Sequence, residues 1–253
     1  MTEVQPTFVL VHGGHAGAWV WDEVRPLLIR PSVAVDLPGH GSRPGELAAL
    51  SFAECSRCIT DQIPPTGPLI LVGHSLGAAV VLSSLQQLAD RTIHVIVLAG
   101  PVPQPGQSVL DSFPLVMRVA SRLILSLSGP TFAASRKITE RTLFNGLSSE
   151  RAGQAFDRLT RESAALVREP VLWTGRLPAA GTYIKCLQDR GPLSPRHQDR
   201  MAANLGEGVR MVSLDACHYA MLECPAQVAA VLNQVVAGAG RQNPDQSDAA
   251  DSR

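Results

Sequence analysis

The strongest constraint on this 253-residue chain is a G-x-S-x-G motif at residues 73–77, Gly-His-Ser-Leu-Gly. An apolar run at residues 68–72 predicts a short strand before the motif, and residues 76–89 have the pattern of a helix. A serine between a strand and a helix occupies a sharp, strained turn, and glycines two residues before and after it avoid collisions there. The five letters alone also describe ordinary glycine-serine turns. In this context they predict that Ser75 is a nucleophile.

The same turn predicts one half of an oxyanion hole. It would direct the amide of Leu76 toward a negative charge developing beside Ser75, and the N-terminus of the following helix adds a favourable potential. A second donor is expected from Gly14, because the sequence His12-Gly-Gly14 directly follows the first predicted strand. A glycine-rich turn without catalytic duty is the alternative for that segment. We predict that the amides of Gly14 and Leu76 form the hole.

Outside this motif, strands and helices alternate along the chain. Apolar runs predict strands at residues 8–11, 32–36, 68–72, 92–98, 182–187 and 208–214. The runs are apolar on both faces and are separated by helical patterns, and an amphipathic helix at residues 225–237 closes the chain. This order predicts an α/β fold with a mostly parallel, doubly wound sheet that helices cover on both sides.

The segment at residues 103–178 interrupts the alternation because it contains no convincing strand. Helices are expected at residues 108–127, 131–143 and 149–169, the last with a cap near Ser148. A helical insertion between two strands is expected to form a lid over the carboxyl edge of the sheet, where α/β proteins bind ligands. The chain then divides into a core (1–102 and 179–238), a helical lid (103–178) and a disordered polar tail (239–253).

Apolar side chains of this lid are expected to give a substrate pocket its character. They are Phe113, Leu115, Met117, Leu123 and Phe132. The alternative for each is packing against the sheet or against other lid helices. His15 and Tyr219 flank the expected oxyanion hole and base, so they are candidates for substrate contacts, with purely structural roles as the alternative.

A serine hydroxyl is a weak nucleophile, so a base must accept its proton and an acid must orient that base. In enzymes built on this turn, the acid and then the base follow the serine along the chain. Three of the seven histidines follow Ser75 beyond its own motif. His94 lies within a predicted strand and His197 at a predicted helix start, whereas His218 lies in the loop after the final strand. We predict that His218 is the base.

The acid is expected just past a strand end. Asp189 lies there, two residues after the predicted strand that ends at Leu187. Asp215 is the alternative acid. It lies only three residues before His218 on the same loop, so it is poorly placed to bind the side of the imidazole that faces away from the serine. Asp199 is expected on a helix. We predict that Asp189 is the acid.

Taken together, these motifs make the chain resemble the α/β-hydrolases, specifically the branch of plant methylesterases, hydroxynitrile lyases and their bacterial relatives. The resemblance covers about residues 7–236 and rests on these segments: Phe8-Val-Leu-Val-His-Gly-Gly14, Trp19-Val-Trp21, Val35-Asp-Leu-Pro-Gly-His-Gly41, the serine motif, Leu143-Phe-Asn-Gly-Leu-Ser148, Arg161-Glu-Ser163, Tyr183-Ile184, Pro195-Arg-His-Gln198 and His218-Tyr-Ala-Met221. The resemblance implies the α/β-hydrolase fold and the same roles for Ser75, His218, Asp189, Gly14 and Leu76.

Two departures narrow the expected chemistry. The lyases of this branch carry Thr after the first-strand His and Lys after the catalytic His, where this chain has Gly13 and Tyr219. A lyase needs a cation near the leaving cyanide, and a tyrosine does not supply one at neutral pH. The nucleophile is also a serine rather than an aspartate, which argues against epoxide hydrolase and haloalkane dehalogenase chemistry.

Composition limits the class of partner. Lys and Arg number 22, as do Asp and Glu, so the balanced charge argues against a nucleic acid or an anionic membrane as the main partner. With 45% hydrophobic and 17% charged residues, a mainly disordered protein is excluded. No basic, apolar leader and no membrane-length apolar run is present, so the expected location is cytoplasmic. Five irregularly spaced cysteines argue against a disulfide framework.

The sequence therefore predicts a serine hydrolase that cleaves a carboxylic ester of a small apolar molecule through an acyl-enzyme. A methyl ester and a lactone are candidate substrates, and no metal or organic cofactor is needed. The same triad would serve a biosynthetic acyltransferase or cyclase, and a ligand-binding receptor on this scaffold is a further alternative. The sequence makes no prediction of oligomeric state.

Overall fold

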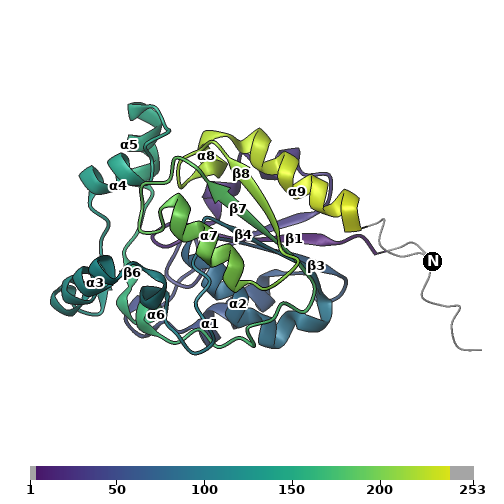
Figure 1. Ribbon diagram of the computed structural model, residues 1–253, viewed down its shortest axis with the longest axis horizontal. Helices are drawn as coiled ribbons and strands as arrows, with labels where there is room; N and C mark the ends of the chain where they lie inside the picture. Colours follow the sequence, from purple (N-terminus) through teal and green to yellow (C-terminus); the bar gives the residue numbers. More distant parts are fainter. Residues whose placement is uncertain (1–3, 240–253) are drawn as a thin grey trace, which may run out of the picture.

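Figure 1 shows a computed structural model of the protein, which describes residues 4–239. Six strands form one sheet in the order β2-β1-β3-β4-β7-β8, and each neighbouring pair is parallel. The strands are β1 Thr7–Val11, β2 Ser32–Val35, β3 Leu69–His74, β4 Thr92–Leu98, β7 Ala180–Cys186 and β8 Arg210–Leu214. The predicted α/β fold with a parallel sheet is confirmed.

Helices cover both faces of this sheet because its strands are apolar on both faces. In β1, Val9 and Val11 belong to one buried cluster, and Phe8 and Leu10 belong to the other. The first cluster also takes in side chains from α1 Phe52–Gln62, α2 Leu76–Leu88 and α7 Pro195–Asn204. The second takes in side chains from α8 Ala220–Glu223 and α9 Pro225–Ala239, which lie across the sheet from α1 and α2 (Figure 1).

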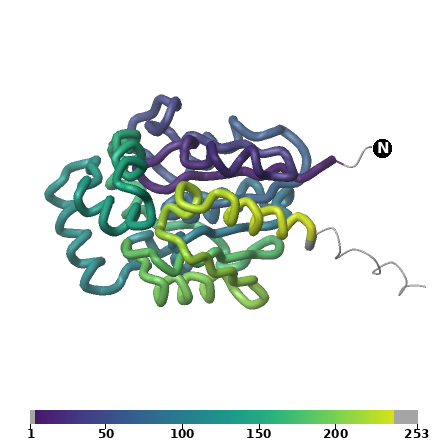
Figure 2. Tube along the Cα trace, turned by 90° about the horizontal axis from the view of Figure 1, so that it is seen from above, coloured from purple at the N-terminus to yellow at the C-terminus, as the bar shows by residue number. Residues whose placement is uncertain are grey.

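Residues 103–178 lie between β4 and β7. Residues 172–178 run beside α2, where the Gln86 side chain donates to the Leu172 carbonyl at 3.0 Å, and residues 109–168 gather at one end of the molecule (Figure 2). Their elements are a 3-10 helix at Val109–Ser112, α3 Leu115–Ser128, β5 Thr131–Phe132, α4 Arg136–Thr142, α5 Ser149–Asp157, β6 Glu162–Ser163 and α6 Ala164–Arg168. Elsewhere in the described residues there are four further 3-10 helices: Ala18–Trp21, Arg25–Leu27, Leu47–Ala49 and Ala89–Arg91. The predicted cap of α5 is confirmed, since the Ser148 side chain accepts a hydrogen bond from the Arg151 amide at 3.3 Å.

The expectation that this segment contains no strand is wrong. β5 and β6 form a short antiparallel pair, so the helix expected at 131–143 begins only at Arg136 and the one expected at 149–169 is interrupted. Tertiary hydrogen bonds explain the interruption. The Thr160 amide donates to the carbonyl of His15 in the core at 2.8 Å, and the Arg161 side chain donates to the carbonyl of Thr131 at 2.6 Å. The helix expected at 108–127 is likewise divided at Pro114.

Three expectations from the sequence concern regions away from the sheet centre. The tail expected at 239–253 lies, apart from Ala239, outside the described residues. The cysteines, for which no disulfide framework is expected, are free, and Cys55 and Cys58 are buried on α1, where burial raises the pKa of both thiols. None of the helices in the described part of the chain combines the length and apolar character that crossing a bilayer requires.

Candidate active site

Ser75 occupies the sharp turn between β3 and α2. Its backbone is strained, with φ of 48° and ψ of −127°. Glycine is required on both sides for steric reasons. A Cβ on Gly73 would lie 2.5 Å from the Cα of Ala78, and one on Gly77 would lie 2.3 Å from the carbonyl oxygen of His12. The Ser75 amide donates to the Leu98 carbonyl of β4 at 3.0 Å, which ties the turn to the sheet.

A buried histidine–aspartate pair lies beside this turn. Nδ1 of His218, in the loop after β8, donates to Oδ2 of Asp189, in the loop after β7, at 2.7 Å. The aspartate accepts two more hydrogen bonds, from the Gly191 amide at 2.7 Å and from Nε2 of Gln198 at 2.8 Å. With Nδ1 bonded to a carboxylate, the neutral imidazole leaves Nε2 free to accept a proton.

The other candidates for acid and base have different partners. Asp215 is exposed and accepts a hydrogen bond from Gln188 at 2.7 Å, and Asp199 pairs with Lys185 on the protein surface. His197 is bonded to the hydroxyl of Ser194 at 2.7 Å, near the start of α7. His94 lies within β4, bonded to Thr182 of β7 at 2.9 Å, and burial lowers its pKa to about 4.

The two amides expected to form an oxyanion hole lie beside Ser75. Leu76 is the first residue of α2, and Gly14 lies in the turn that follows β1. Within residues 4–239, neither amide donates a hydrogen bond, so both are available to a ligand. The residue before Gly14 has no room for a side chain, since a Cβ on Gly13 would lie 2.8 Å from Cβ of Ser75.

These groups open onto one pocket with a volume of about 200 Å³. Ser75, His218 and both oxyanion residues line it, together with the two residues expected to contact substrate, His15 and Tyr219. The remaining lining residues are mainly apolar: Pro101, Val109, Phe113, Phe132, Leu143, Val167, Pro192 and Leu193, with Glu162 as the one carboxylate. The loops after β1, β3, β4, β7 and β8 all contribute, because parallel strands end at the same edge of the sheet.

Two of the five apolar side chains expected at the pocket do line it, namely Phe113 and Phe132. The other three are exposed on α3 and are absent from the pocket lining, so that part of the prediction is wrong. Leu115 and Leu123 are 64% and 62% exposed, and Met117 is 39% exposed. The sequence predicted a helix with apolar side chains here, but it contained no information on which of those side chains would reach the pocket.

Tyr219 provides no positive charge to the site. Burial raises the pKa of its phenol, and the neutral hydroxyl donates to the Gly14 carbonyl at 3.4 Å. The ring packs edge-on against His74 and Phe144, with centroids 4.8 and 4.7 Å apart. The position that a cationic lysine would need for cyanohydrin cleavage is therefore occupied by a neutral aromatic residue.

Three polar residues at the site were not predicted as functional. Gln198 is fully buried on α7, where it donates to Asp189. Glu162 of β6 and His40 of the loop after β2 are buried against each other, 3.3 Å apart. All three lie within segments that carry the family resemblance. Nothing in the sequence, however, indicated that the three side chains would be buried beside the pocket.

Gln198 is expected to hold the acid in place. Replacing Gln198 with Ala removes one donor to Asp189 and leaves the buried Cys186 amide, which now donates to Gln198 at 2.9 Å, without an acceptor. We expect the unfolding free energy to fall by about 2 kcal/mol and kcat for the ester cleavage predicted from the sequence to fall roughly tenfold. Gln188→Ala is the matched control because this side chain donates to the exposed Asp215. Equal kcat values for the two variants would contradict the assignment.

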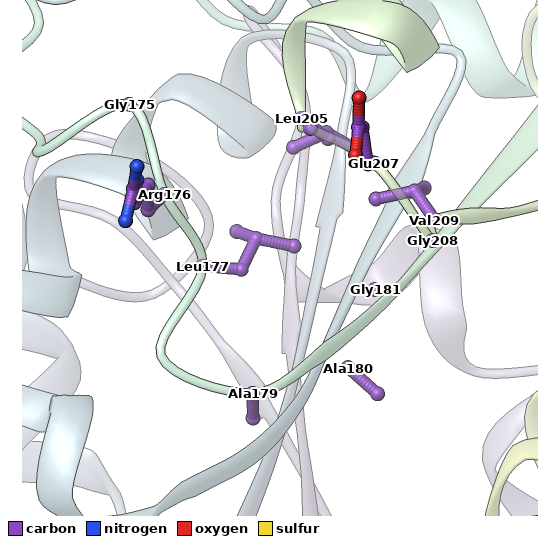
Figure 3. A pocket seen from close by; sticks show the side chains of 11 residues that line it. Gly175, Arg176, Leu177, Ala179, Ala180, Gly181, Leu205, Glu207, Gly208 and Val209 are labelled. Carbon is purple, nitrogen blue, oxygen red and sulfur yellow. The ribbon is translucent and has the colours of Figure 1, made fainter.

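A larger hollow, with a volume of about 420 Å³, lies at the opposite edge of the sheet (Figure 3). It is lined by residues 175–181 before and at the start of β7 and residues 205–209 before β8. Its two charged residues, Arg176 and Glu207, lie on opposite sides of it (Figure 3). No serine, histidine or buried polar side chain lines it. In the described chain, no group of three or more His, Cys, Asp or Glu residues is arranged to hold a metal ion.

Comparison with known proteins agrees with this geometry. The alpha/beta hydrolase family matches the chain over residues 8–231, which covers the sheet, the turn at Ser75 and the loop of His218. The protein is an alpha/beta hydrolase. Its resemblance to the branch that contains plant methylesterases is also confirmed, since curated members of that branch match this hydrolase.

Polyneuridine aldehyde esterase of Rauvolfia serpentina is 31% identical to this hydrolase over 116 residues, which is 43% of this chain and 44% of the relative. The chain thus matches less than half the length of that relative. Probable esterase PIR7A of rice is 25% identical over 256 residues, covering 91% of this chain and 96% of the relative.

Solved structures share the fold of this hydrolase. An extracellular α/β-hydrolase from a Paenibacillus species superposes with a TM-score of 0.81 at 23% identity, covering 91% of this chain and 98% of that one. A pyrethroid hydrolase from Sphingobium faniae JZ-2 has a TM-score of 0.78 at 23% identity, covering 92% of this chain and 97% of that one.

Proposed function

We propose that this α/β hydrolase is a serine-dependent esterase that cleaves carboxylic esters of small, mainly apolar molecules through an acyl-enzyme. One observation carries the proposal. A strained serine, a histidine bonded to a buried aspartate and two amides without acceptors all line a single apolar pocket. We assign Ser75 as nucleophile, His218 as base, Asp189 as acid, and the amides of Gly14 and Leu76 as oxyanion donors.

The first half of the reaction forms an ester to Ser75. The hydroxyl oxygen attacks the substrate carbonyl carbon while Nε2 of His218 takes its proton, and the two amides bind the resulting oxyanion. Asp189 holds the imidazole in the tautomer that accepts this proton and stabilises the charged form. When the tetrahedral intermediate collapses, its bond to the alcohol oxygen breaks and His218 gives that oxygen the proton.

The second half returns the enzyme to its starting state. His218 removes a proton from water, whose oxygen attacks the acyl carbon, and the oxyanion again forms against the amides of Gly14 and Leu76. Collapse of this intermediate releases the carboxylic acid, and Ser75 recovers its proton from His218. No metal or organic cofactor enters this scheme, because the residues of the chain carry every proton transfer.

The pocket supports a small, uncharged substrate. A volume of about 200 Å³ compares with roughly 150 Å³ for an engineered cavity that holds one benzene ring, so the enclosed part is about one ring with a few more atoms. Most lining residues are apolar, and no Lys or Arg is among them. An anionic substrate would lose water around its charge there without gaining a lysine or arginine among the described lining residues.

The names of the relatives support ester cleavage. Those with curated names include a polyneuridine aldehyde esterase, a pheophorbidase and the methylesterase MES16, and one solved neighbour is a pyrethroid hydrolase.

We further propose residues 103–178 as the lid that selects the substrate, since Val109, Phe113, Phe132, Leu143, Glu162 and Val167 of that segment line the pocket. In this proposal the partner is the substrate alone, with no nucleic acid or membrane involved, and the reaction takes place in the cytoplasm.

The decisive experiment is a mass-spectrometric screen of aryl esters, methyl esters and lactones for an adduct on Ser75. We expect a transient acyl-enzyme with neutral substrates, followed by the free acid. An aryl ester whose acyl chain ends in a carboxylate should show kcat/KM at least about tenfold lower than its uncharged isostere, because the pocket offers no cation to replace water around the charge. An acyl group that passes to an added alcohol rather than to water would indicate an acyltransferase. Thermal stabilisation by an ester without any adduct would indicate a receptor.

A further inference from the structure

The proposed chemistry leaves one buried charged group of the pocket without a role. Glu162 lies on β6 in the inserted segment, is 2% exposed, and lines the pocket next to the turn that carries Gly14. A Cβ on Gly14 would lie 3.2 Å from Oε2 of this glutamate. A carboxylate so close to a site where negative charge develops would oppose catalysis unless its own charge is balanced.

His40 supplies that balance. Its Nε2 lies 3.3 Å from Oε2 of Glu162, and both side chains are buried, at 1% and 2% exposure. Burial alone would lower the pKa of His40, but contact with the Glu162 carboxylate outweighs it and raises the pKa above its usual value. Burial alone would raise the pKa of Glu162. Its contacts with His40 and with the His15 amide outweigh burial and lower the pKa of Glu162 below its usual value. Both shifts favour the charged form of each partner, so His40 offsets the negative charge that Glu162 brings to the pocket.

The glutamate uses its oxygens to hold two backbone amides. Oε2 accepts from the amide of His15 at 2.9 Å, and Oε1 accepts from the amide of Ser163 at 2.7 Å. The first of these contacts crosses from the inserted segment to the core. It binds the residue directly after Gly14, whose own amide has no acceptor in the described chain.

His15 needs such contacts to keep its conformation. Its φ is +64°, a left-handed backbone that non-glycine residues rarely adopt. Besides the bond to Glu162, its carbonyl accepts from the Thr160 amide at 2.8 Å and its Nδ1 is bonded to the Thr160 carbonyl at 3.0 Å. Strained residues persist where the surroundings hold them at several points, and here the holding groups come from the inserted segment.

We propose that Glu162 is a positioning residue for the oxyanion hole: by binding the His15 amide it fixes the direction of the adjacent Gly14 amide. This inference rests on the proposed ester hydrolysis. It means that the core supplies nucleophile, base and acid, whereas the inserted segment completes the geometry that stabilises the transition state. Without the segment in place, the turn after β1 would relax and one of the two oxyanion donors would move.

Two substitutions remove this contact to different degrees. In Glu162→Gln one oxygen becomes an NH₂ group, so the side chain no longer accepts from both amides. In Glu162→Ala both acceptors are lost. Loss of a complete oxyanion donor lowers kcat by about 100-fold to 1,000-fold, so we expect a fall of roughly tenfold for Gln and about 100-fold for Ala. KM should change by less than about threefold, since the contact acts on the transition state.

Glu169 provides a matched control. It lies in the same inserted segment, and its carboxylate accepts the amide of Phe52 in the core at 2.8 Å, outside the pocket lining. Glu169→Gln and Glu169→Ala therefore break a comparable contact between segment and core without touching the turn at Gly14. We expect wild-type kcat for both variants even if their thermal stability falls.

Two further measurements separate positioning from general damage. A trifluoromethyl ketone forms an oxyanion on Ser75, whereas the matching methyl ketone binds as a ground-state analogue. Glu162→Ala should weaken binding of the trifluoromethyl ketone by about the same factor as it lowers kcat, and it should leave binding of the methyl ketone unchanged. Hydrogen exchange of the peptide covering residues 12–17 should accelerate in Glu162→Ala and stay at the wild-type rate in Glu169→Ala.

The inference is overturned if folded Glu162 variants keep wild-type kcat and trifluoromethyl ketone affinity, or if the Glu169 variants lose both to the same extent. If Glu162→Ala does not fold, the isosteric Glu162→Gln decides between these outcomes. A wild-type protein that cleaves no ester and reacts with no fluorophosphonate would instead overturn the proposed function, and with it any catalytic meaning of the contact. An active wild type beside unaffected Glu162 variants would overturn the positioning role alone.

Discussion

Replacing Ser75 with Ala is expected to abolish ester cleavage, with a loss in kcat of about 10⁵-fold to 10⁶-fold, equivalent to roughly 7–8 kcal/mol in activation free energy. Among the described residues that line the pocket, none other than Ser75 is a serine, threonine or cysteine that could replace it as nucleophile. The hydroxyl forms no capping hydrogen bond to α2, so its removal should leave the unfolding free energy nearly unchanged. The loss would therefore be chemical rather than structural.

The measurement combines turnover of an activated aryl ester with labelling by a fluorophosphonate probe. Wild-type protein should take up one label, and Ser75→Ala none. Ser194→Ala is the matched control, because the Ser194 hydroxyl is bonded to a histidine, His197, at 2.7 Å, but Ser194 lies outside the pocket lining. Labelling that survives in Ser75→Ala, or disappears in Ser194→Ala, would show that the nucleophile has been misassigned.

The second large effect is expected at the acid. Asp189→Asn should lower kcat by about 10⁴-fold, the size of effect seen when the acid of a serine triad becomes an amide and the histidine adopts the wrong tautomer. The Asp189 carboxylate also accepts hydrogen bonds from the Gly191 amide and from the Gln198 side chain. The NH₂ group of an asparagine at this position would therefore face a hydrogen-bond donor. A negative charge that stabilises protonated His218 is lost at the same time.

Asp215→Asn tests the competing assignment directly. This carboxylate is exposed and bonded to Gln188, and we expect kcat to change by less than about twofold. Pre-steady-state kinetics with an aryl ester should show that Asp189→Asn slows both acylation and deacylation, since His218 acts in each. A large loss in Asp215→Asn with a small one in Asp189→Asn would exchange the two roles.

The sequence was sufficient to locate the proposed catalytic residues because their arrangement depends on local requirements. A nucleophile turn needs glycines at 73 and 77, since Cβ atoms there would collide with Ala78 and with the His12 carbonyl. Strands that are apolar on both faces must be covered by helices on both sides, which is typical of parallel sheets, so the parallel sheet could be predicted. Once the sheet was known, the loops after its last two strands led to Asp189 and His218, whose contact at 2.7 Å lies where chain order placed it.

The inserted segment was less predictable because its structure depends on partners far away in the sequence. Residues 160–163 leave their helical pattern to bond with His15, about 145 positions earlier, and with β5. The apolar residues of α3 were evident in the sequence, yet Leu115 and Leu123 are exposed to solvent, while Phe113 just before the helix lines the pocket. Apolar composition does not determine which of these side chains contacts the pocket.

The sequence by itself therefore determined the fold, the strained turn at Ser75 and the order of the proposed acid and base, because steric and hydrophobic constraints act over a few residues. Only the tertiary structure decided which lid side chains reach the pocket and how Glu162, His40 and His15 meet beside Gly14. Those contacts join segments more than a hundred residues apart, and burial of a charged pair depends on the complete packed surroundings. No local pattern in the chain carries that information.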